Sequence, residues 1–186
     1  MDFLDDVLAA TVGPKLSPAE KEVKPILFDE NIQVLSTFEL HQVASLTYNV
    51  VAVDGIFELI APILRTPIDH TPLTVQKSLV VVRHVLIYGS EPVVNHAYGL
   101  LDLIKALMEY NTVLMRQQQG GAMSFFQTLQ GGGVDKGAPV REAAEGIVNL
   151  LSDTNNLRRI RITSASQDSL VPVGDDGIAF VSDDVR

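Results

Sequence analysis

The sequence predicts an all-α protein, because capped amphipathic segments follow one another along the chain and strand signals are nearly absent. Two capping boxes, Ser17-Pro-Ala-Glu20 and Ser36-Thr-Phe-Glu39, are typical of helix N-termini. Apolar residues after them recur at spacings of three and four, which is the helical period. The Asp-Gly pairs at 54–55 and 176–177 do not join alternating apolar runs, so neither indicates a hairpin. We therefore expect short helices stacked so that each buries its apolar stripe against its neighbours.

Three helices are predicted in the first third of the chain. Pro18 stands at the first position of one of them, and Pro25 is expected to kink or end it. The second follows Ser36 and carries one apolar stripe through Leu40, Val43, Ala44 and Thr47. The third spans Ile56, Leu59, Ile60, Ile63 and Leu64, and Pro62 within it predicts a kink or an early end.

The most apolar stretch, residues 78–88, belongs to a fourth predicted helix that opens at Thr71-Pro72 and stops at Gly89. Its length and flanking caps favour a helix covered on most sides over a buried strand. Arg83 and His84 interrupt the apolar run, which is far shorter than the roughly 20 residues that span a bilayer. His84 is therefore interpreted as a core or boundary histidine.

The second half of the chain continues the helical pattern around one irregular segment. A further amphipathic segment lies around residues 100–108, and residues 117–137 predict a flexible loop rich in Gly and Gln. Ala138-Pro139 opens another helix, and Asp153 caps a last short one that is expected to end near Arg161. We expect an acidic amphipathic segment (1–16), a helical domain (17–161) and an acidic tail (162–186).

Composition restricts the possible functions. Of 186 residues, 46% are hydrophobic and 20% are charged, which suits a globular domain. The formal net charge of -9 argues against nucleic-acid binding, which needs a basic face. The absence of cysteine excludes disulfides and thiolate metal sites. The four histidines lack metal-ligand spacing, and no nucleophile elbow or phosphate-binding loop is present. We expect no catalysis, no cofactor and no metal.

Three segments in order carry a resemblance to a known family. They are Leu46-Thr-Tyr-Asn-Val-Val-Ala52, Lys77 to Glu91 (KSLVVVRHVLIYGSE), and Gly137-Ala-Pro-Val-Arg-Glu142 with the leucine-rich continuation to Asp153. This set resembles the epsin N-terminal homology (ENTH) domain. The resemblance implies a right-handed superhelix of about eight helices, an architecture shared with VHS domains. It also implies an adaptor in clathrin-linked vesicle trafficking and endocytosis, which binds phosphoinositide headgroups and trafficking proteins.

The same resemblance suggests where a headgroup would bind. Lys24, His70 and Lys77 fall at or near basic positions of the family. Ile63 stands where the family has an arginine, and the N-terminal segment is acidic where the family is basic. Because acidic groups are repelled by an anionic leaflet, we expect phosphoinositide binding to be weak. The alternative is a protein-docking module for a SNARE or a coat or adaptor subunit, with no lipid binding.

Candidate partner-binding residues lie near both ends of the chain. Phe3 and Phe180 stand among aspartates, in the manner of the acidic phenylalanine peptides that adaptor appendage domains recognise. Arg158, Arg159 and Arg161 form the only dense basic cluster, which we interpret as the solvated face of the last helix. Together with the resemblance to ENTH domains, the two phenylalanine segments imply clathrin, adaptor or SNARE proteins as partners. The expected location is cytoplasmic, peripheral on vesicle, endosomal or plasma membranes.

Overall fold

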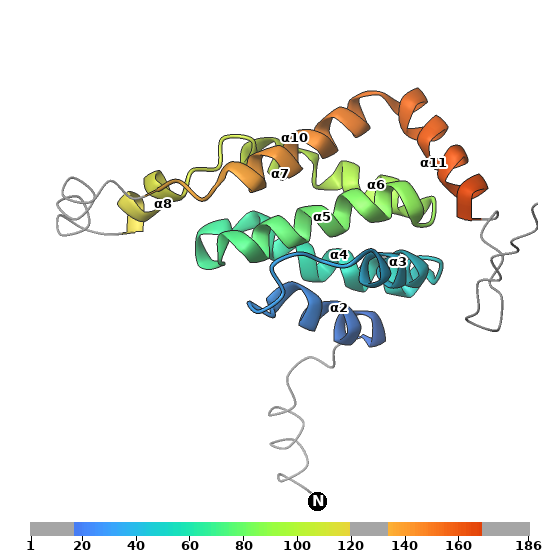
Figure 1. Ribbon diagram of the computed structural model, residues 1–186, viewed down its shortest axis with the longest axis horizontal. Coiled ribbons are helices and arrows are strands. Elements are labelled where there is room, and N and C mark those ends of the chain that lie inside the picture. The colour runs from blue at the N-terminus through green and yellow to red at the C-terminus, as the bar shows by residue number, and fades with distance from the viewer. Residues whose placement is uncertain (1–16, 120–133, 169–186) are drawn as a thin grey trace, which may run out of the picture.

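The computed structural model describes residues 17–119 and 134–168, and this part of the chain consists of helices joined by short loops and turns (Figure 1). It contains nine α-helices, one 3-10 helix (η1) and no strand, so the all-α prediction is confirmed. In chain order the elements are α2 (Pro18–Phe28), α3 (Thr37–Leu46), α4 (Val50–Arg65), η1 (Pro67–Asp69), α5 (Pro72–Tyr88), α6 (Pro92–Gly99), α7 (Leu101–Leu107), α8 (Thr112–Gln119), α10 (Ala138–Ser152) and α11 (Thr154–Asp168).

Side-chain caps determine where the first helices begin. Ser17 and Ser36 each accept from the backbone N–H three residues on, and the glutamate at that position bonds back, so both predicted capping boxes are confirmed. Asn49 caps α4 by accepting from the Val51 backbone N–H, and Thr71 caps α5 by accepting from that of Thr74. These caps satisfy backbone donors that have no partner inside the helix.

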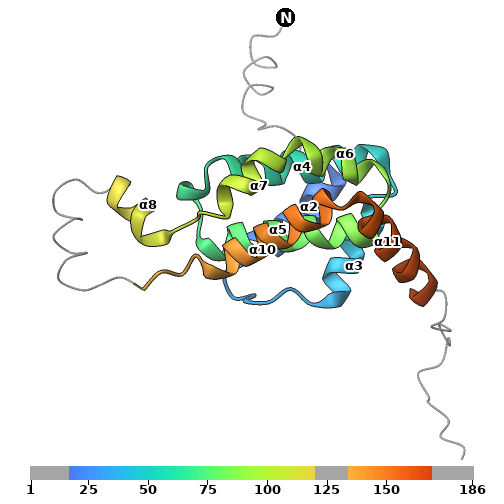
Figure 2. The same cartoon turned by 90° about the horizontal axis from the view of Figure 1, so that it is seen from above.

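Helix α5 is the centre of the fold. It contacts α2, α3, α4, α6, α10 and α11, and Figures 1 and 2 show it running through the middle of the molecule. Its apolar side chains are buried on several faces: Val75, Leu79, Val81, Val82, Val85 and Leu86. A fully buried side chain of this size stabilises the fold by about 1.5–3 kcal/mol. The prediction of a helix covered on most sides is confirmed.

Gly55 lets α4 approach the start of α2. A Cβ atom at this position would lie 2.5 Å from the hydroxyl of Ser17, which is the capping group of α2. Any larger residue would therefore displace either the cap or the helix.

Neither internal proline ends its helix. Pro25 lies inside α2 and Pro62 inside α4, and each helix continues for three more residues, to Phe28 and Arg65. Each proline lacks one backbone donor, yet its own carbonyl accepts from the N–H of the residue after the helix, Asp29 or Thr66.

The last helix extends beyond its predicted end. Helix α11 continues to Asp168, so the prediction that helical structure stops near Arg161 is wrong, and residues 162–168 of the predicted tail are helical. The hydroxyls of Thr163 and Ser166 donate to carbonyls four residues earlier, Arg159 and Ile162. These polar side chains hydrogen-bond to the backbone of their own helix. Because they are not apolar, the sequence shows no apolar period that would predict a helix here.

The predicted 117–137 loop is described only at its edges. Residues 117–119 belong to α8, and the central residues lie outside the described part. On the far side, the Asp135 carboxylate accepts from the Thr112 and Gly137 backbone N–H groups and from Arg141. The loop is therefore anchored where it rejoins the helical domain. The assignment of 1–16 as an amphipathic segment also lies outside the described residues.

Candidate functional site

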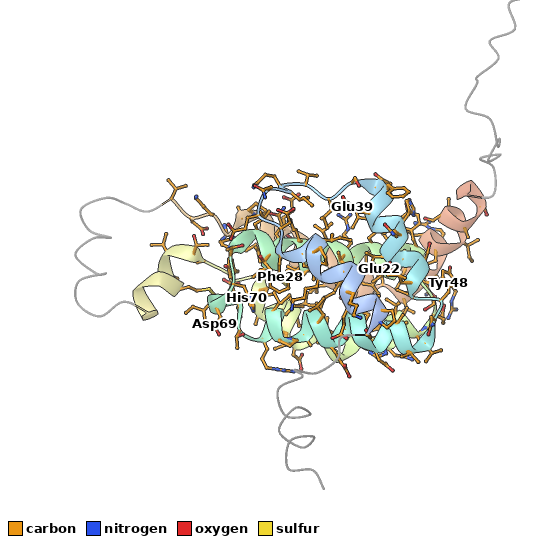
Figure 3. The ribbon with its side chains drawn as sticks, turned by 90° about the horizontal axis from the view of Figure 1, so that it is seen from below. Glu22, Phe28, Glu39, Tyr48, Asp69 and His70 are labelled. Atoms are coloured by element: carbon orange, nitrogen blue, oxygen red, sulfur yellow. The ribbon has the colours of Figure 1, made fainter. Side chains whose placement is uncertain are left out.

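The three residues predicted to contact a headgroup lie around the C-terminal end of α2. Lys24 is on α2, His70 follows η1, and Lys77 is on α5. Figure 3 shows Phe28, Asp69 and His70 together at this end of the molecule, and the rings of Phe28 and His70 meet edge to face at 6.0 Å. We call this region the α2 corner. The fold thus brings these three residues to one place, although Lys24 is exposed and Lys77 is buried.

Lys77 is used inside the α2 corner. Its side chain is 2% exposed, and Nζ donates to the carbonyl of Asp29 at 2.6 Å and to that of Ile26 at 3.3 Å. These carbonyls stand at the end of α2, where intrahelical donors run out and the helix dipole favours a cation. Burial lowers the pKa of Lys77, partly offset by attraction to Asp29. This structural role counts against a headgroup contact, which stays a prediction.

Lys24 is the exposed basic residue among the three, and it has a second lysine beside it. Lys21 and Lys24 are three residues apart on α2, so they share one face of the helix. Together with Pro25, Phe28 and Asp29 they line a shallow depression of about 400 Å³. This depression offers two ammonium groups and the half-exposed ring of Phe28 to a ligand.

Acidic groups border the same surface. The Asn31 backbone N–H and side-chain amide both donate to the Asp29 carboxylate at 2.9 Å. These hydrogen bonds hold the pKa of Asp29 below its ordinary value, so the group is ionised at neutral pH. Glu30 and Asp69 are exposed close by in the chain. The α2 corner therefore has a mixed charge rather than the concentrated positive charge that a polyphosphate headgroup favours.

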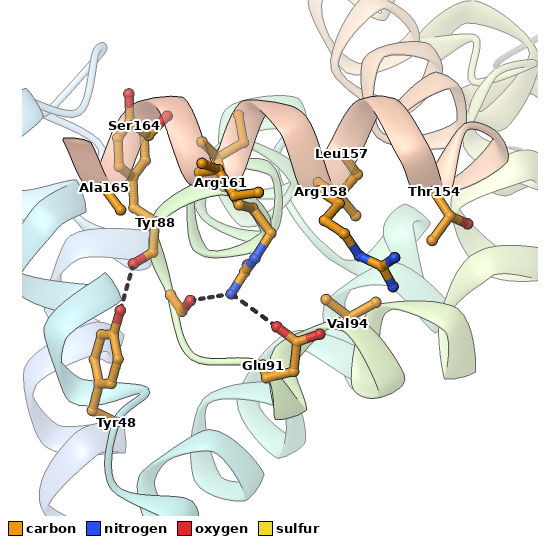
Figure 4. A pocket seen from close by; sticks show the side chains of 13 residues that line it. Tyr48, Tyr88, Glu91, Val94, Thr154, Leu157, Arg158, Arg161, Ser164 and Ala165 are labelled. Carbon is orange, nitrogen blue, oxygen red and sulfur yellow. Dashed lines mark hydrogen bonds and ion pairs between the residues drawn. The ribbon is translucent and has the colours of Figure 1, made fainter. Parts of the chain in front are cut away.

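A deeper pocket lies at the opposite end of α5, where α11 passes over the turn into α6 (Figure 4). It has a volume of about 360 Å³. Its walls include the rings of Tyr48 and Tyr88, the aliphatic side chains of Val94 and Leu157, and the guanidinium of Arg158. We call it the α11 pocket.

Arg161 joins the floor of this pocket to α5. Its guanidinium donates to the carbonyls of Leu86 and Gly89, the latter at 2.6 Å, and lies 3.6 Å from the Glu91 carboxylate. The side chain is 18% exposed, so the interpretation of all three arginines as a solvated face is wrong for Arg161. A usable signal was present: Arg161 follows the buried Leu157 by four residues and so lies on the same helix face.

A third hollow of about 470 Å³ separates α4 from α6. His96 stacks on Phe57 with ring centroids 5.0 Å apart, and its Nε2 lies 3.2 Å from the Asp54 carboxylate. The hollow is shallow, and two of its polar side chains, His96 and Asp54, pair with each other.

The remaining predicted site residues fall outside the part of the chain that the structure describes. Phe3 and Phe180 are both in this category. Among residues 17–119 and 134–168, no three His, Asp or Glu side chains are grouped so that they could hold a metal ion. Within the same ranges, every helix is too short or too polar to cross a bilayer.

Comparisons with known proteins place the chain in a family. The family model described as "ENTH domain" matches residues 16–157. No curated protein matches the chain. Among solved structures, the yeast Ent2 ENTH domain is 22% identical with a TM-score of 0.63, covering 80% of this chain and 99% of that one. The human epsinR ENTH domain is 20% identical with a TM-score of 0.60, covering 82% and 99%.

A third similar structure is the epsin-2 ENTH domain in complex with phosphatidylinositol 4,5-bisphosphate. It is 23% identical with a TM-score of 0.62, and the match covers 83% of this chain and 96% of that one. At such identities, the similarity establishes the shared fold. The family model covers most of the chain, from before α2 into α11, and contains all three segments that carried the resemblance. The chain therefore belongs to the ENTH domain family.

Proposed function

We propose that this chain is an adaptor module of clathrin-linked vesicle trafficking, which binds phosphoinositide membranes weakly through the α2 corner and also binds trafficking proteins. Membership of the ENTH family supports the adaptor role, and a similar ENTH domain has been solved with phosphatidylinositol 4,5-bisphosphate. The observation that carries the membrane contact is the exposed pair Lys21 and Lys24 beside the Phe28 and His70 rings. The module works by docking, without catalysis or a cofactor, at the cytoplasmic surface of vesicle, endosomal or plasma membranes.

Weak binding follows from the charges of the α2 corner. Each basic residue near an anionic membrane contributes about 1 kcal/mol, and nearby carboxylates oppose that attraction. The Lys77 ammonium group donates to the carbonyls of Ile26 and Asp29. Lys21 and Lys24 are therefore the exposed lysines of this surface. Two lysines beside ionised Asp29 support a contact that salt easily screens.

The test is co-sedimentation with phosphatidylcholine vesicles that contain or lack phosphatidylinositol 4,5-bisphosphate. The wild type should sediment only with the phosphoinositide vesicles and only at low salt. Lys24→Glu reverses one charge, which corresponds to roughly thirtyfold weaker partitioning at about 1 kcal/mol per charge. Lys105→Glu is the matched control, because Lys105 is exposed on α7, which does not line the depression beside Lys21 and Lys24. Equal loss in both variants would contradict a site at α2.

A second candidate function is protein docking with no lipid binding, for a SNARE or a coat or adaptor subunit. The burial of Lys77 and the ionised Asp29 favour it, because both reduce the attraction of the α2 corner for a polyphosphate. In the same assay, this function predicts that neither the wild type nor Lys24→Glu sediments with either kind of vesicle.

A further inference from the structure

We infer that the α11 pocket binds a short acidic peptide of a partner protein, with an apolar side chain of that peptide inserted between α11 and the end of α5. This inference deepens the protein-binding part of the proposed function and does not depend on lipid. The pocket volume of about 360 Å³ is near the lower end of the range for ligand sites, about 300–1,000 Å³. It therefore suits one or two side chains rather than a large ligand or a second folded domain.

The interior of the pocket favours an apolar side chain. The rings of Tyr48 and Tyr88 and the side chains of Val94 and Leu157 line it. Tyr48 is 72% exposed, although its hydroxyl lies 3.4 Å from the Tyr88 carbonyl (Figure 4). An exposed aromatic ring at the mouth of a concave site lined by apolar side chains is typical of the anchoring centre of an interface.

Apolar exposure continues at the pocket wall and in the chain just after Tyr48. Ile162, which lines the pocket from α11, is 63% exposed, while Val50 and Val51 at the start of α4 are 68% and 70% exposed. Solitary exposed aliphatic residues need no explanation, whereas several next to a pocket mark a binding surface. A peptide anchored in the pocket would cover Ile162, and one that extended past Tyr48 would reach the residues that follow it.

The charge of the pocket rim determines the class of peptide. The guanidinium of Arg158 lines the pocket, and within the described residues it forms no ion pair. Arg161 and Glu91 pair with each other and so contribute little net charge. The rim is therefore cationic in a chain whose formal net charge is -9. Such a local reversal of sign favours carboxylates, and a guanidinium binds a carboxylate through two parallel hydrogen bonds.

The experiment measures fluorescence anisotropy with a labelled peptide, Asp-Asp-Gly-Leu-Phe-Gly-Asp-Asp, and the full chain in solution without lipid. Arg158→Glu should weaken binding about tenfold or more, because charge-assisted hydrogen bonds are lost and repulsion is added. Arg159→Glu is the matched control. It makes the same charge change one residue along α11, at an exposed position that does not line the pocket. Its effect should stay within about twofold at physiological salt, where screening is effective beyond about 8 Å.

A second pair of measurements tests the apolar insertion. Tyr48→Ala should weaken binding about tenfold, as expected for truncation of an aromatic anchor. Val134→Ala should leave binding unchanged, because Val134 is exposed ahead of α10 and does not line the pocket. A peptide with Ala-Ala in place of Leu-Phe, and one with Lys in place of Asp, should each bind more weakly than the original. Circular dichroism of each variant confirms that the helices are intact.

Three results would overturn the inference. One is equal affinity of the peptide for the wild type and Arg158→Glu, and another is equal binding of the Lys-substituted peptide. The third concerns the chain's own acidic C-terminal sequence. If the peptide bound only after Asp175, Asp176, Asp183 and Asp184 were replaced by Asn, the occupant would be that sequence rather than a partner. Failure of lipid binding in the vesicle assay leaves all of these readouts unchanged.

Discussion

At each end of α5 a mostly buried cation donates to carbonyls at the end of a helix, but the groups that surround the two cations differ. At the α2 corner, Lys77 donates to the last carbonyls of α2, and at the α11 pocket, Arg161 donates to the last carbonyls of α5. Each cation joins segments more than forty residues apart in sequence. In both places an exposed cation stands nearby, Lys24 in one and Arg158 in the other.

The position of a lysine or arginine in a sequence motif therefore does not reveal which group its side chain binds. Helix C-termini carry unpaired carbonyls and a partial negative charge, so they compete with external anions for any lysine or arginine within reach. The buried cation satisfies the backbone, and the exposed neighbour remains available for a ligand. The α2 corner differs in that Asp29 and Glu30 accompany its exposed lysines, whereas Glu91 at the other end is already paired.

The largest expected effect comes from reversing the charge at Lys77. Lys77→Glu would place a carboxylate against the carbonyls of Ile26 and Asp29 in a site that is 2% exposed. Leaving an uncompensated charge in such a position costs about 3–5 kcal/mol of unfolding free energy. Urea unfolding followed by circular dichroism measures this loss.

Lys24→Glu, on the exposed face of α2, is the control and should change stability by no more than about 0.5 kcal/mol. Equal stability of the two variants would show that Lys77 is not held inside the fold. It would also restore Lys77 as a candidate for the headgroup.

The next largest effect is expected at Arg161. Arg161→Ala removes the donors to Leu86 and Gly89 and should cost about 2 kcal/mol, because two buried carbonyls lose charge-assisted hydrogen bonds. Amide hydrogen exchange should rise along α11, whose docking on α5 depends on this contact. Arg159→Ala removes an exposed guanidinium of the same helix and should leave both readouts near wild type. Similar losses in the two variants would contradict the distinction between buried and exposed arginines.

The sequence predicted the fold well where local chemistry determines it. Each capping box, Ser17 with Glu20 and Ser36 with Glu39, determines a helix start through residues only three positions apart. Gly89 likewise marks the end of α5. The site was harder to predict, because burial of Lys77 depends on a contact with residues 48 and 51 positions away. The length of α11 was missed for another reason, since Thr163 and Ser166 are neither apolar nor strong helix formers.

Asp135 is a carboxylate that binds backbone donors, whereas Lys77 and Arg161 are cations that bind backbone carbonyls. Its replacement is expected to change stability less than theirs. Asp135 accepts from the backbone N–H groups of Thr112 and Gly137 and pairs with Arg141 at 2.6 Å. The Arg141 guanidinium, followed by these N–H groups, holds the pKa of Asp135 far below its ordinary value. A carboxyl with a lowered folded-state pKa stabilises the protein above its unfolded pKa of about 3.9 and loses that contribution as pH falls further.

Asp135→Asn should therefore lower the melting temperature at neutral pH and flatten its decline between about pH 5 and pH 2. Asp102→Asn, at an exposed position on α7, is the matched substitution and should preserve the decline of the wild type. Identical pH profiles for Asp135→Asn and the wild type would show that the carboxylate does not anchor the loop.

The smallest effect on stability, and the sharpest test of the comparison, concerns the two exposed cations. Lys24→Glu and Arg158→Glu should each change the free energy of unfolding by no more than about 0.5 kcal/mol, since neither is buried. Their effects on ligands should be opposite. Lys24→Glu should reduce sedimentation with phosphoinositide vesicles and leave peptide binding intact, and Arg158→Glu should do the reverse. If one variant lost both activities, the lipid and peptide surfaces would overlap, and the separation of function between the two ends of α5 would be wrong.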